Sequence, residues 1–274
     1  MWEEINEKQN EDKMLQLLYY SRKLYNNANT LFLYKIIILV INAILAIIDI
    51  NPIVIVILSI IYLILQYCEN ICIKNASRAR EIFDAILFEF QIPNDYENIK
   101  ENAFKMCQKN KKEFEIQKNN TGEDTPPGVK NWYTQNDGNT KNEIIFKCQI
   151  ENTKWDEKVT KINSIVFWSG IIILFIIYII ARNKDSVIDF VLGILLSFEL
   201  IIQLIEVSLE YRKYNKNLIE RKFLIEKIKL KKIKKDELVS LQKLINERRN
   251  LKLVPFNNIH KFITIKMHDL MKNK

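Results

Sequence analysis

The apolar residues of this chain are gathered into four dense blocks, and this clustering limits the fold more strongly than any other feature. The blocks cover residues 31–48, 52–67, 165–181 and 187–205. A helix needs about 17–25 mostly apolar residues to cross the ~30 Å hydrocarbon core of a bilayer. Because each block is close to that length, the sequence predicts an all-α integral membrane protein with four spans.

The blocks come in two pairs, and a short polar turn joins the members of each pair. Asp49 and Pro52 mark the first turn, and residues 182–186 form the second. If the first pair were one long helix, Asp49 and Pro52 would lie inside the bilayer, where a charge and a helix-breaking ring are both costly. We therefore expect two transmembrane hairpins, at 31–68 and 163–206.

Two hairpins place three polar segments on one side of the membrane: residues 1–30, 69–162 and 207–274. Lys and Arg gather next to the spans on that side, which the positive-inside rule assigns to the cytoplasm. These residues are Arg22, Lys23, Lys74, Arg78, Arg80, Lys158, Lys161, Arg212 and Lys213. Arg182 and Lys184 in an outer turn oppose this orientation and are outnumbered. Residues 1–30 are too polar and acidic for a signal peptide, so both termini are predicted to be cytoplasmic.

The cytoplasmic segments are predicted to form one helical body with a net positive charge. The expected elements are a helix in 1–30, a helix at 78–90 closed by Pro93, a helical stretch at 97–117, a loop at 119–128, a helix from about 142, and a helical tail to about 250. The helix from 142 is expected to run straight into the third span, so that tilting its cytoplasmic end would tilt the span.

The fourth block carries a stripe of polar residues. Glu199, Gln203, Glu206 and Glu210 are spaced by four, three and four residues, which places them on one face of a helix. An ionised carboxylate facing lipid is costly, so this face needs protein, water or a cation. Two interpretations remain open. In the first, Glu199, Gln203 and Glu206 line a pore built from several copies; in the second, Glu199 is protonated or paired inside one four-helix unit, and Glu206 and Glu210 lie in interfacial water.

Patterns typical of catalysis are missing from the sequence. There is no GxxxxGK[ST], GxGxxG, HExxH or GxSxG pattern, and the chain has only five glycines to build a phosphate-cradling loop. Four cysteines and two histidines include no CxxC pair, so neither a metal site nor a disulfide framework is predicted. We expect a protein that is not an enzyme and has no catalytic residues. Cys68 and Cys72 are interpreted as packing residues.

Some residues nevertheless have the chemistry to bind an anionic or aromatic ligand. Trp132, Tyr133 and Trp155 could stack on a base, although core or interfacial aromatics are commoner. Arg248 and Arg249 are better anion candidates than the lysine-rich run at 227–235, because guanidinium forks bind phosphate in a bidentate way. The lysine run is most simply a solvated face, and contact with anionic lipid head groups is the next interpretation.

Five motifs occur in order around the hairpins. They are LLYYSRKLYNNA at 17–28, ASRAREIFDAILF at 76–88, the pair Trp132 and Tyr133, CQ..N..WD at 148–156, and LQKLINERRNLKLVP at 241–255. Over nearly its whole length the chain resembles the SMODS-associated four-transmembrane effector family, predicted pore formers of bacterial cyclic-oligonucleotide antiphage (CBASS) systems. It departs from the family at Ile82, because a glutamine and a glutamate are expected there before the Phe–Asp pair.

The resemblance implies a non-enzymatic effector of the bacterial inner membrane. It implies that a cyclic oligonucleotide, made by a partner nucleotidyltransferase, binds the cytoplasmic region, and that a homo-oligomer then disrupts the membrane and causes abortive infection. Membrane lipids are expected partners, whereas DNA, RNA and further cofactors are not. Motif membership and chemistry give the candidate ligand-binding residues: Trp132, Tyr133, Gln149, Asn152, Trp155, Arg248 and Arg249. The alternative is a non-conducting membrane scaffold or sensor that recruits a protein partner.

Overall fold

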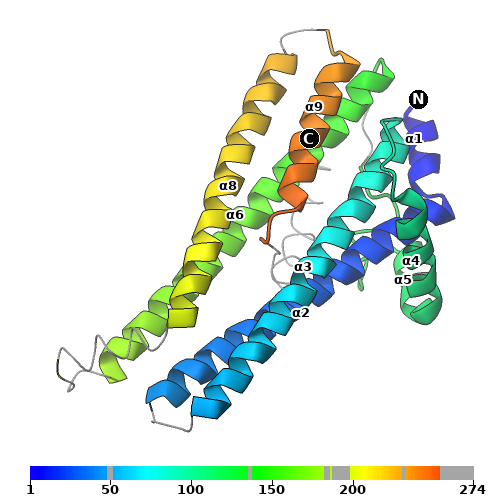
Figure 1. Cartoon of the computed structure of the whole chain (residues 1–274). Coiled ribbons are helices and arrows are strands. Elements are labelled where there is room, and N and C mark those ends of the chain that lie inside the picture. Colours follow the sequence, from blue (N-terminus) through cyan, green and yellow to red (C-terminus); the bar gives the residue numbers. More distant parts are fainter. Residues whose placement is uncertain (48–51, 135–137, 182–185, 187–197, 230–231, 254–274) are drawn as a thin grey trace.

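The computed structural model describes residues 1–47, 52–134, 138–181, 186, 198–229 and 232–253. Within this part, every extended regular element is an α-helix, which confirms the predicted all-α class. Figure 1 shows long helices running along an elongated bundle, with short helices beside one end of it. The apolar ends of the long helices gather at the opposite end of the bundle.

The first predicted hairpin is a pair of packed helices, α2 (Asp12–Ile47) and α3 (Pro52–Phe88). Pro52 is the first residue of α3, a position where its missing N–H costs no helical hydrogen bond. The helices contain 36 and 37 residues, so at ~1.5 Å per residue each is longer than a bilayer is thick. Each therefore continues without a break from its apolar block into a polar half.

The second pair consists of α6 (Lys141–Ala181) and α8 (Phe198–Lys229). The 41-residue α6 joins the CQ..N..WD motif to the third apolar block, as predicted. Three of the described helices, α2, α3 and α6, are long and apolar enough to cross a membrane. Most of the predicted fourth span, residues 187–197, lies outside the described residues.

Large apolar side chains of the apolar blocks face outward from the bundle. Examples are Ile37, Ile53, Ile64, Ile172 and Ile180, which are between 53% and 65% exposed. A water-soluble helix bundle would bury such residues, because each is worth roughly 1.5–3 kcal/mol when removed from water. Their outward orientation fits contact with lipid and supports the membrane assignment.

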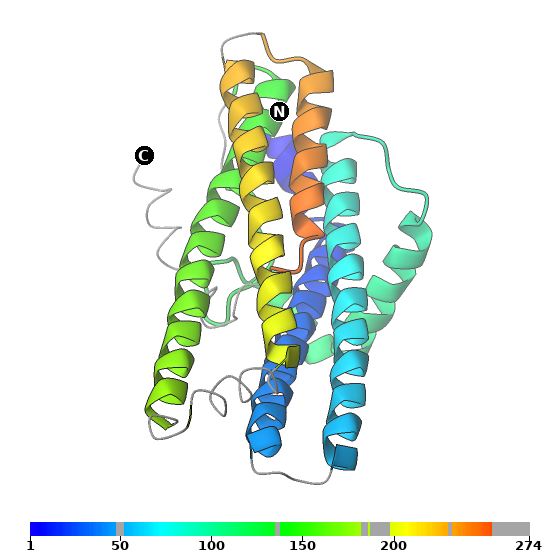
Figure 2. The ribbon, with the colours of Figure 1, turned by 60° about the vertical axis from the view of Figure 1, so that its left-hand side comes forward.

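The polar halves of the long helices pack with the remaining elements into a region that we call the body. It also contains α1 (Trp2–Gln9), α4 (Tyr96–Lys109), α5 (Lys111–Asn119), the segment 120–134 and α9 (Lys235–Arg249). The views in Figures 1 and 2 show α9 lying between α3 on one side and α6 with α8 on the other. The helix α9 therefore bridges the two hairpins.

One apolar core holds the body together. It combines buried side chains from α1, α2, α3, α6, α8 and α9: Ile5, Met14, Leu18, Phe83, Phe88, Ile144, Ile228, Leu241 and Ile245. Ile99 and Ala103 of α4 and Val129 and Tyr133 of the segment 120–134 also belong to it. Residues more than 200 positions apart in the chain thus share one core, so described parts of all three polar segments pack together.

Three helix boundaries differ from the sequence prediction. The predicted stretch 97–117 is two helices, which meet at Asn110, and residues 1–30 hold the short α1 as well as the start of α2. The helix α3 ends at Phe88, ahead of Pro93, because Glu89 adopts a left-handed conformation with φ 56°. The N–H of Phe90 then donates to the carbonyl of Ala85, which caps the helix end.

Candidate functional site

Asp84 is the centre of a buried hydrogen-bond network in the body. Its carboxylate accepts hydrogen bonds from the Tyr133 hydroxyl (2.9 Å) and from Nε2 of Gln242 (2.7 Å), and it pairs with Nη1 of Arg249 (2.7 Å). A fully buried carboxylate needs such partners, because it is otherwise strongly destabilised. Burial, and next the Asp84 charge, raise the pKa of Tyr133 well above its usual value, which keeps the hydroxyl protonated as a donor.

Gln149 extends this network to α6. Its Nε2 donates to the carbonyl oxygen of Leu238 (2.9 Å) and to Oε1 of Gln242 (3.0 Å). Gln149 and Gln242 are both buried. The network therefore ties together α3, α6, α9 and the segment 120–134, so that a shift of one element disturbs hydrogen bonds of the others.

Trp132 lies beside this network, next to two arginines. The guanidinium carbon of Arg80 is 3.8 Å from the centre of the indole ring, and that of Arg22 is 5.8 Å away. Nη1 of Arg22 also donates to the carbonyl of Pro127 (2.8 Å) and to Oε1 of Gln117 (3.3 Å). Burial, helped by the neighbouring Arg249, lowers the pKa of Arg80 to about 10.

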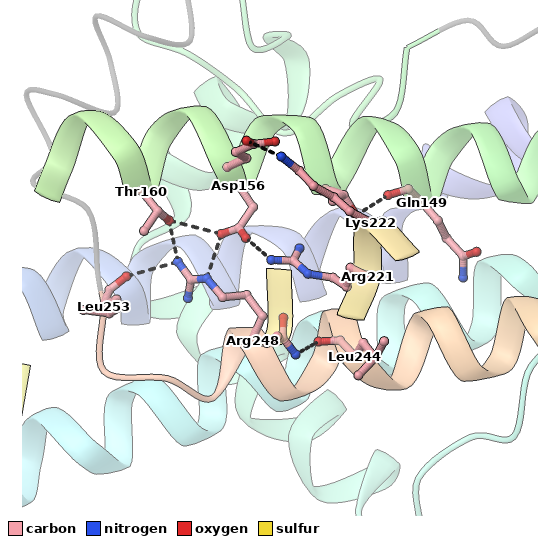
Figure 3. Close-up of polar contacts among 11 residues, drawn as sticks. Gln149, Asp156, Thr160, Arg221, Lys222, Leu244, Arg248 and Leu253 are labelled. Carbon is pink, nitrogen blue, oxygen red and sulfur yellow. Dashed lines mark hydrogen bonds and ion pairs between the residues drawn. The ribbon is translucent and has the colours of Figure 1, made fainter. Parts of the chain in front are cut away.

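A second polar cluster joins α6, α8 and α9 (Figure 3). Asp156 lies between two arginines: its Oδ2 is 2.7 Å from Nη2 of Arg221, and its Oδ1 is 2.8 Å from Nε of Arg248. Nη2 of Arg248 also donates to the hydroxyl of Thr160 (3.0 Å). Arg221 is fully buried, and burial followed by the Asp156 charge raises the pKa of Tyr214 to about 12. One carboxylate thus holds three helices together.

The predicted stripe on α8 lies against α3. Oε1 of Gln203 accepts a hydrogen bond from the Tyr62 hydroxyl (2.5 Å), and Oε2 of Glu206 accepts one from Nε2 of Gln66 (3.2 Å). These contacts place the Gln203 and Glu206 side chains between helices of one chain. The side chain of Glu199 lies outside the described part of the structure. The assignment of a pore lining to this stripe stays a prediction.

The sequence model of the SMODS-associating 4TM effector domain matches residues 3–274, nearly the whole chain. The chain belongs to this family. The match includes both polar clusters and the long helices, and it confirms the resemblance seen in the motifs. The family description makes the chain a membrane effector associated with an SMODS-type nucleotidyltransferase. No curated protein and no solved structure matches the chain.

In this SMODS-associating effector, the predicted ligand-binding residues fall into separate groups. Tyr133, Gln149 and Arg249 meet in the Asp84 network, whereas Arg248 belongs to the Asp156 cluster. Asn152 and Trp155 are half-buried on the stretch of α6 between the two.

Arg22 and Arg80 were not among the candidates, because their position near the spans explained them as orientation signals. Both lie in effector motifs, Arg22 in LLYYSRKLYNNA and Arg80 in ASRAREIFDAILF. That placement, combined with the Trp132 motif, is the sequence signal that could have identified them. In the structure the three residues form one group in the body of the effector.

Proposed function

We propose that this effector binds a cyclic oligonucleotide through its body and permeabilises the bacterial inner membrane, so that the infected cell stops growing. In this proposal the chain has four spans, both termini and the body are cytoplasmic, and several copies assemble around an ion path. The nucleotide is the product of the associated nucleotidyltransferase. The effector itself carries out no chemical reaction and needs no cofactor besides this ligand.

The observation that carries the proposal is the continuity of α2, α3 and α6. Each helix runs without a break from an apolar, outward-facing segment into the body. The Asp84 network joins α3 and α6 by hydrogen bonds, and the Asp156 cluster joins α6 and α8 by an ion pair. A ligand that prefers one arrangement of the body would therefore tilt the spans, since it shifts an equilibrium by its difference in affinity for the two arrangements.

Assembly of several copies follows from the size of the unit. Two helical hairpins enclose too little space for a wide ion path, and the apolar side chains that face outward can pack against another copy as well as against lipid. Carboxylates in the fourth span would favour cations if assembly or ligand binding turned them toward water.

Ion flux from liposomes tests the proposal. Purified protein is reconstituted, and leak is measured with and without a panel of cyclic di- and trinucleotides. We expect one nucleotide to trigger leak, and we expect the combined changes Glu199→Leu and Glu206→Leu to abolish it without loss of insertion. The matched control is Glu101→Gln, which alters an exposed carboxylate of α4. If folded, inserted protein leaks with none of the nucleotides, the proposal fails.

One observation favours a second candidate, a non-conducting scaffold that recruits a protein partner. Gln203 and Glu206 bond to Tyr62 and Gln66 of the same chain, which is the arrangement expected of a packed bundle. The same pair of glutamate changes separates the two functions. Under the scaffold function, toxicity in cells should persist in the double variant, provided that its expression and thermal unfolding match those of the unchanged protein.

A further inference from the structure

The body contains a group of positive charges with too few carboxylates to neutralise them. The group consists of Arg22 of α2, Arg80 of α3 and Arg249 of α9. The charge of Arg249 lowers the pKa of Arg80, and the charge of Arg80 lowers the pKa of Arg22. Arg249 pairs with Asp84, but no described carboxylate lies within ion-pair distance of Arg22 or Arg80. Burial, and then the charge of Arg80, lower the pKa of Arg22 to about 10.

We propose that Arg22, Arg80 and Arg249, together with the Trp132 indole, form the binding site for a phosphodiester that carries a nucleobase. The assignment rests on the proposed function, which supplies the ligand class, and it adds the location and the chemistry of recognition. Three helices and the segment 120–134 build this site, so a ligand bound there would contact α2, α3 and α9 at once.

The arginines have hydrogen-bond donors available for a phosphate. Nη2 of Arg249 is buried and has no hydrogen-bond partner, while Nη1 of the same residue binds Asp84. The guanidinium of Arg80 makes no hydrogen bond to any described residue, and its carbon lies 3.8 Å from the centre of the Trp132 ring. Guanidinium forks match phosphate oxygens in geometry and charge, and an anion would remove the mutual repulsion of the arginines.

Trp132 supplies the part of the site that distinguishes a nucleotide from inorganic phosphate. Its side chain is half-buried, so part of the indole remains accessible to a ligand. Bases stack on aromatic rings and on guanidinium planes, and each such contact is favourable whatever the base. The combination of Trp132 with Arg80 therefore fits a base next to its phosphodiester.

The position of the group favours a soluble nucleotide over a lipid head group. Arg80 follows the end of the second apolar block, at residue 67, by 13 residues of continuous helix. At ~1.5 Å per residue this places it about 20 Å beyond the apolar segment. A phospholipid head group lies at the edge of the hydrocarbon, so it would not reach Arg80 without leaving the bilayer.

Binding measurements on the full chain in nanodiscs of neutral lipid test the assignment. Isothermal titration with cyclic di- and trinucleotides should give a Kd that Arg80→Ala, Arg22→Ala and Trp132→Leu each weaken about tenfold or more. Arg80→Lys keeps the charge without the planar fork and should restore binding only in part. The control is Arg78→Ala on the same helix, which removes a half-buried arginine paired with Asp95 and Glu81 and should leave the Kd unchanged.

Chemical modification of the unaltered protein tests the same site without depending on whether the variants fold. Phenylglyoxal modifies accessible arginines, and the nucleotide should slow its reaction at Arg22 and Arg80 but not at Arg78. If nucleotide binds and triggers leak while the Arg80 and Arg22 variants bind it normally, the site is wrong and the proposed function stands. If the folded protein binds no nucleotide of the panel, or binds only anionic lipid at these arginines, the site and its ligand class are both wrong.

Discussion

Lys35 of α2 and Glu69 of α3 form an ion pair that is almost completely removed from solvent. Nζ and Oε2 are 2.6 Å apart, and each side chain is 4% exposed. The Lys35 ammonium also lies 5.4 Å from the centre of the Tyr62 ring and 5.6 Å from that of Phe32. Lys35 belongs to the first apolar block, so the pair fixes the two helices of one hairpin at the edge of the predicted membrane region.

Loss of one member of this pair should strongly destabilise the protein. Glu69→Gln leaves the Lys35 charge buried without a counter-ion, and removing one partner of a buried pair typically costs about 3–5 kcal/mol. Thermal and denaturant unfolding in detergent micelles would measure this change in the free energy of unfolding. The combined change Lys35→Met and Glu69→Leu should recover much of the loss, because it buries no charge.

An exposed pair provides the control for that experiment. Lys105 and Glu101 are 67% and 63% exposed, so Glu101→Gln should leave the unfolding curve close to that of the unchanged protein. Equal unfolding curves for Glu69→Gln and Glu101→Gln would mean that the Lys35–Glu69 pair is open to water in the folded protein.

Asp156→Asn should loosen the contact of α6 with α8 and α9. It removes the carboxylate that holds Arg221 and Arg248, and both guanidiniums are then left without their counter-ion in the protein interior. Hydrogen exchange read by mass spectrometry should become faster in α9 and in the body half of α6. Glu157→Gln is the control, since it affects only the exposed pair with Lys222 and should leave exchange there unaltered.

The long apolar helices α2, α3 and α6 could be predicted from the sequence because a membrane span has a signature that does not depend on distant residues. The continuity of α6 was predictable for a similar reason, since residues 142–164 contain neither glycine nor proline. The break at Asn110 was not predictable, because this chain also has asparagines inside its helices, such as Asn26 and Asn27 of α2. Packing determines where the helix breaks. Both α4 and α5 bury one face, and the break lets Cys107 of α4 and Phe114 of α5 reach the same cluster.

The candidate site could be predicted only in part. Motif membership singled out Tyr133 and Arg249, and the structure brings both to Asp84. The partnership of Asp84 with Gln242 spans 158 residues, and no spacing rule joins residues so far apart. Arg80 was not predicted as a site residue for a different reason: the positive-inside rule already explained a positive charge near a span.

Cys107 should be unreactive while the body is folded. Burial raises the pKa of its thiol from 9.0 to about 12, so at pH 9 the folded protein holds about 500-fold less thiolate than an unfolded chain, which is half ionised. Since the folded pKa is the higher one, this thiol lowers stability as the pH rises above about 9. Iodoacetamide labelling of Cys107 in native and in guanidinium-unfolded protein measures the difference. Similar rates would show that α4 does not pack on α2 as the structure has it.

Gly128→Ala should disturb the segment that carries Trp132. A Cβ atom at residue 128 would lie 1.8 Å from the carbonyl oxygen of Asn120, so the backbone has to move, whereas a Cβ at Gly170 meets nothing within 4 Å. We expect Gly128→Ala to cost about 1–3 kcal/mol of stability, measured by thermal unfolding. Because the neighbouring Pro127 carbonyl accepts a hydrogen bond from Arg22, nucleotide affinity should fall as well. Gly170→Ala is the matched control, and an equal effect of the two changes would contradict the packing of this segment.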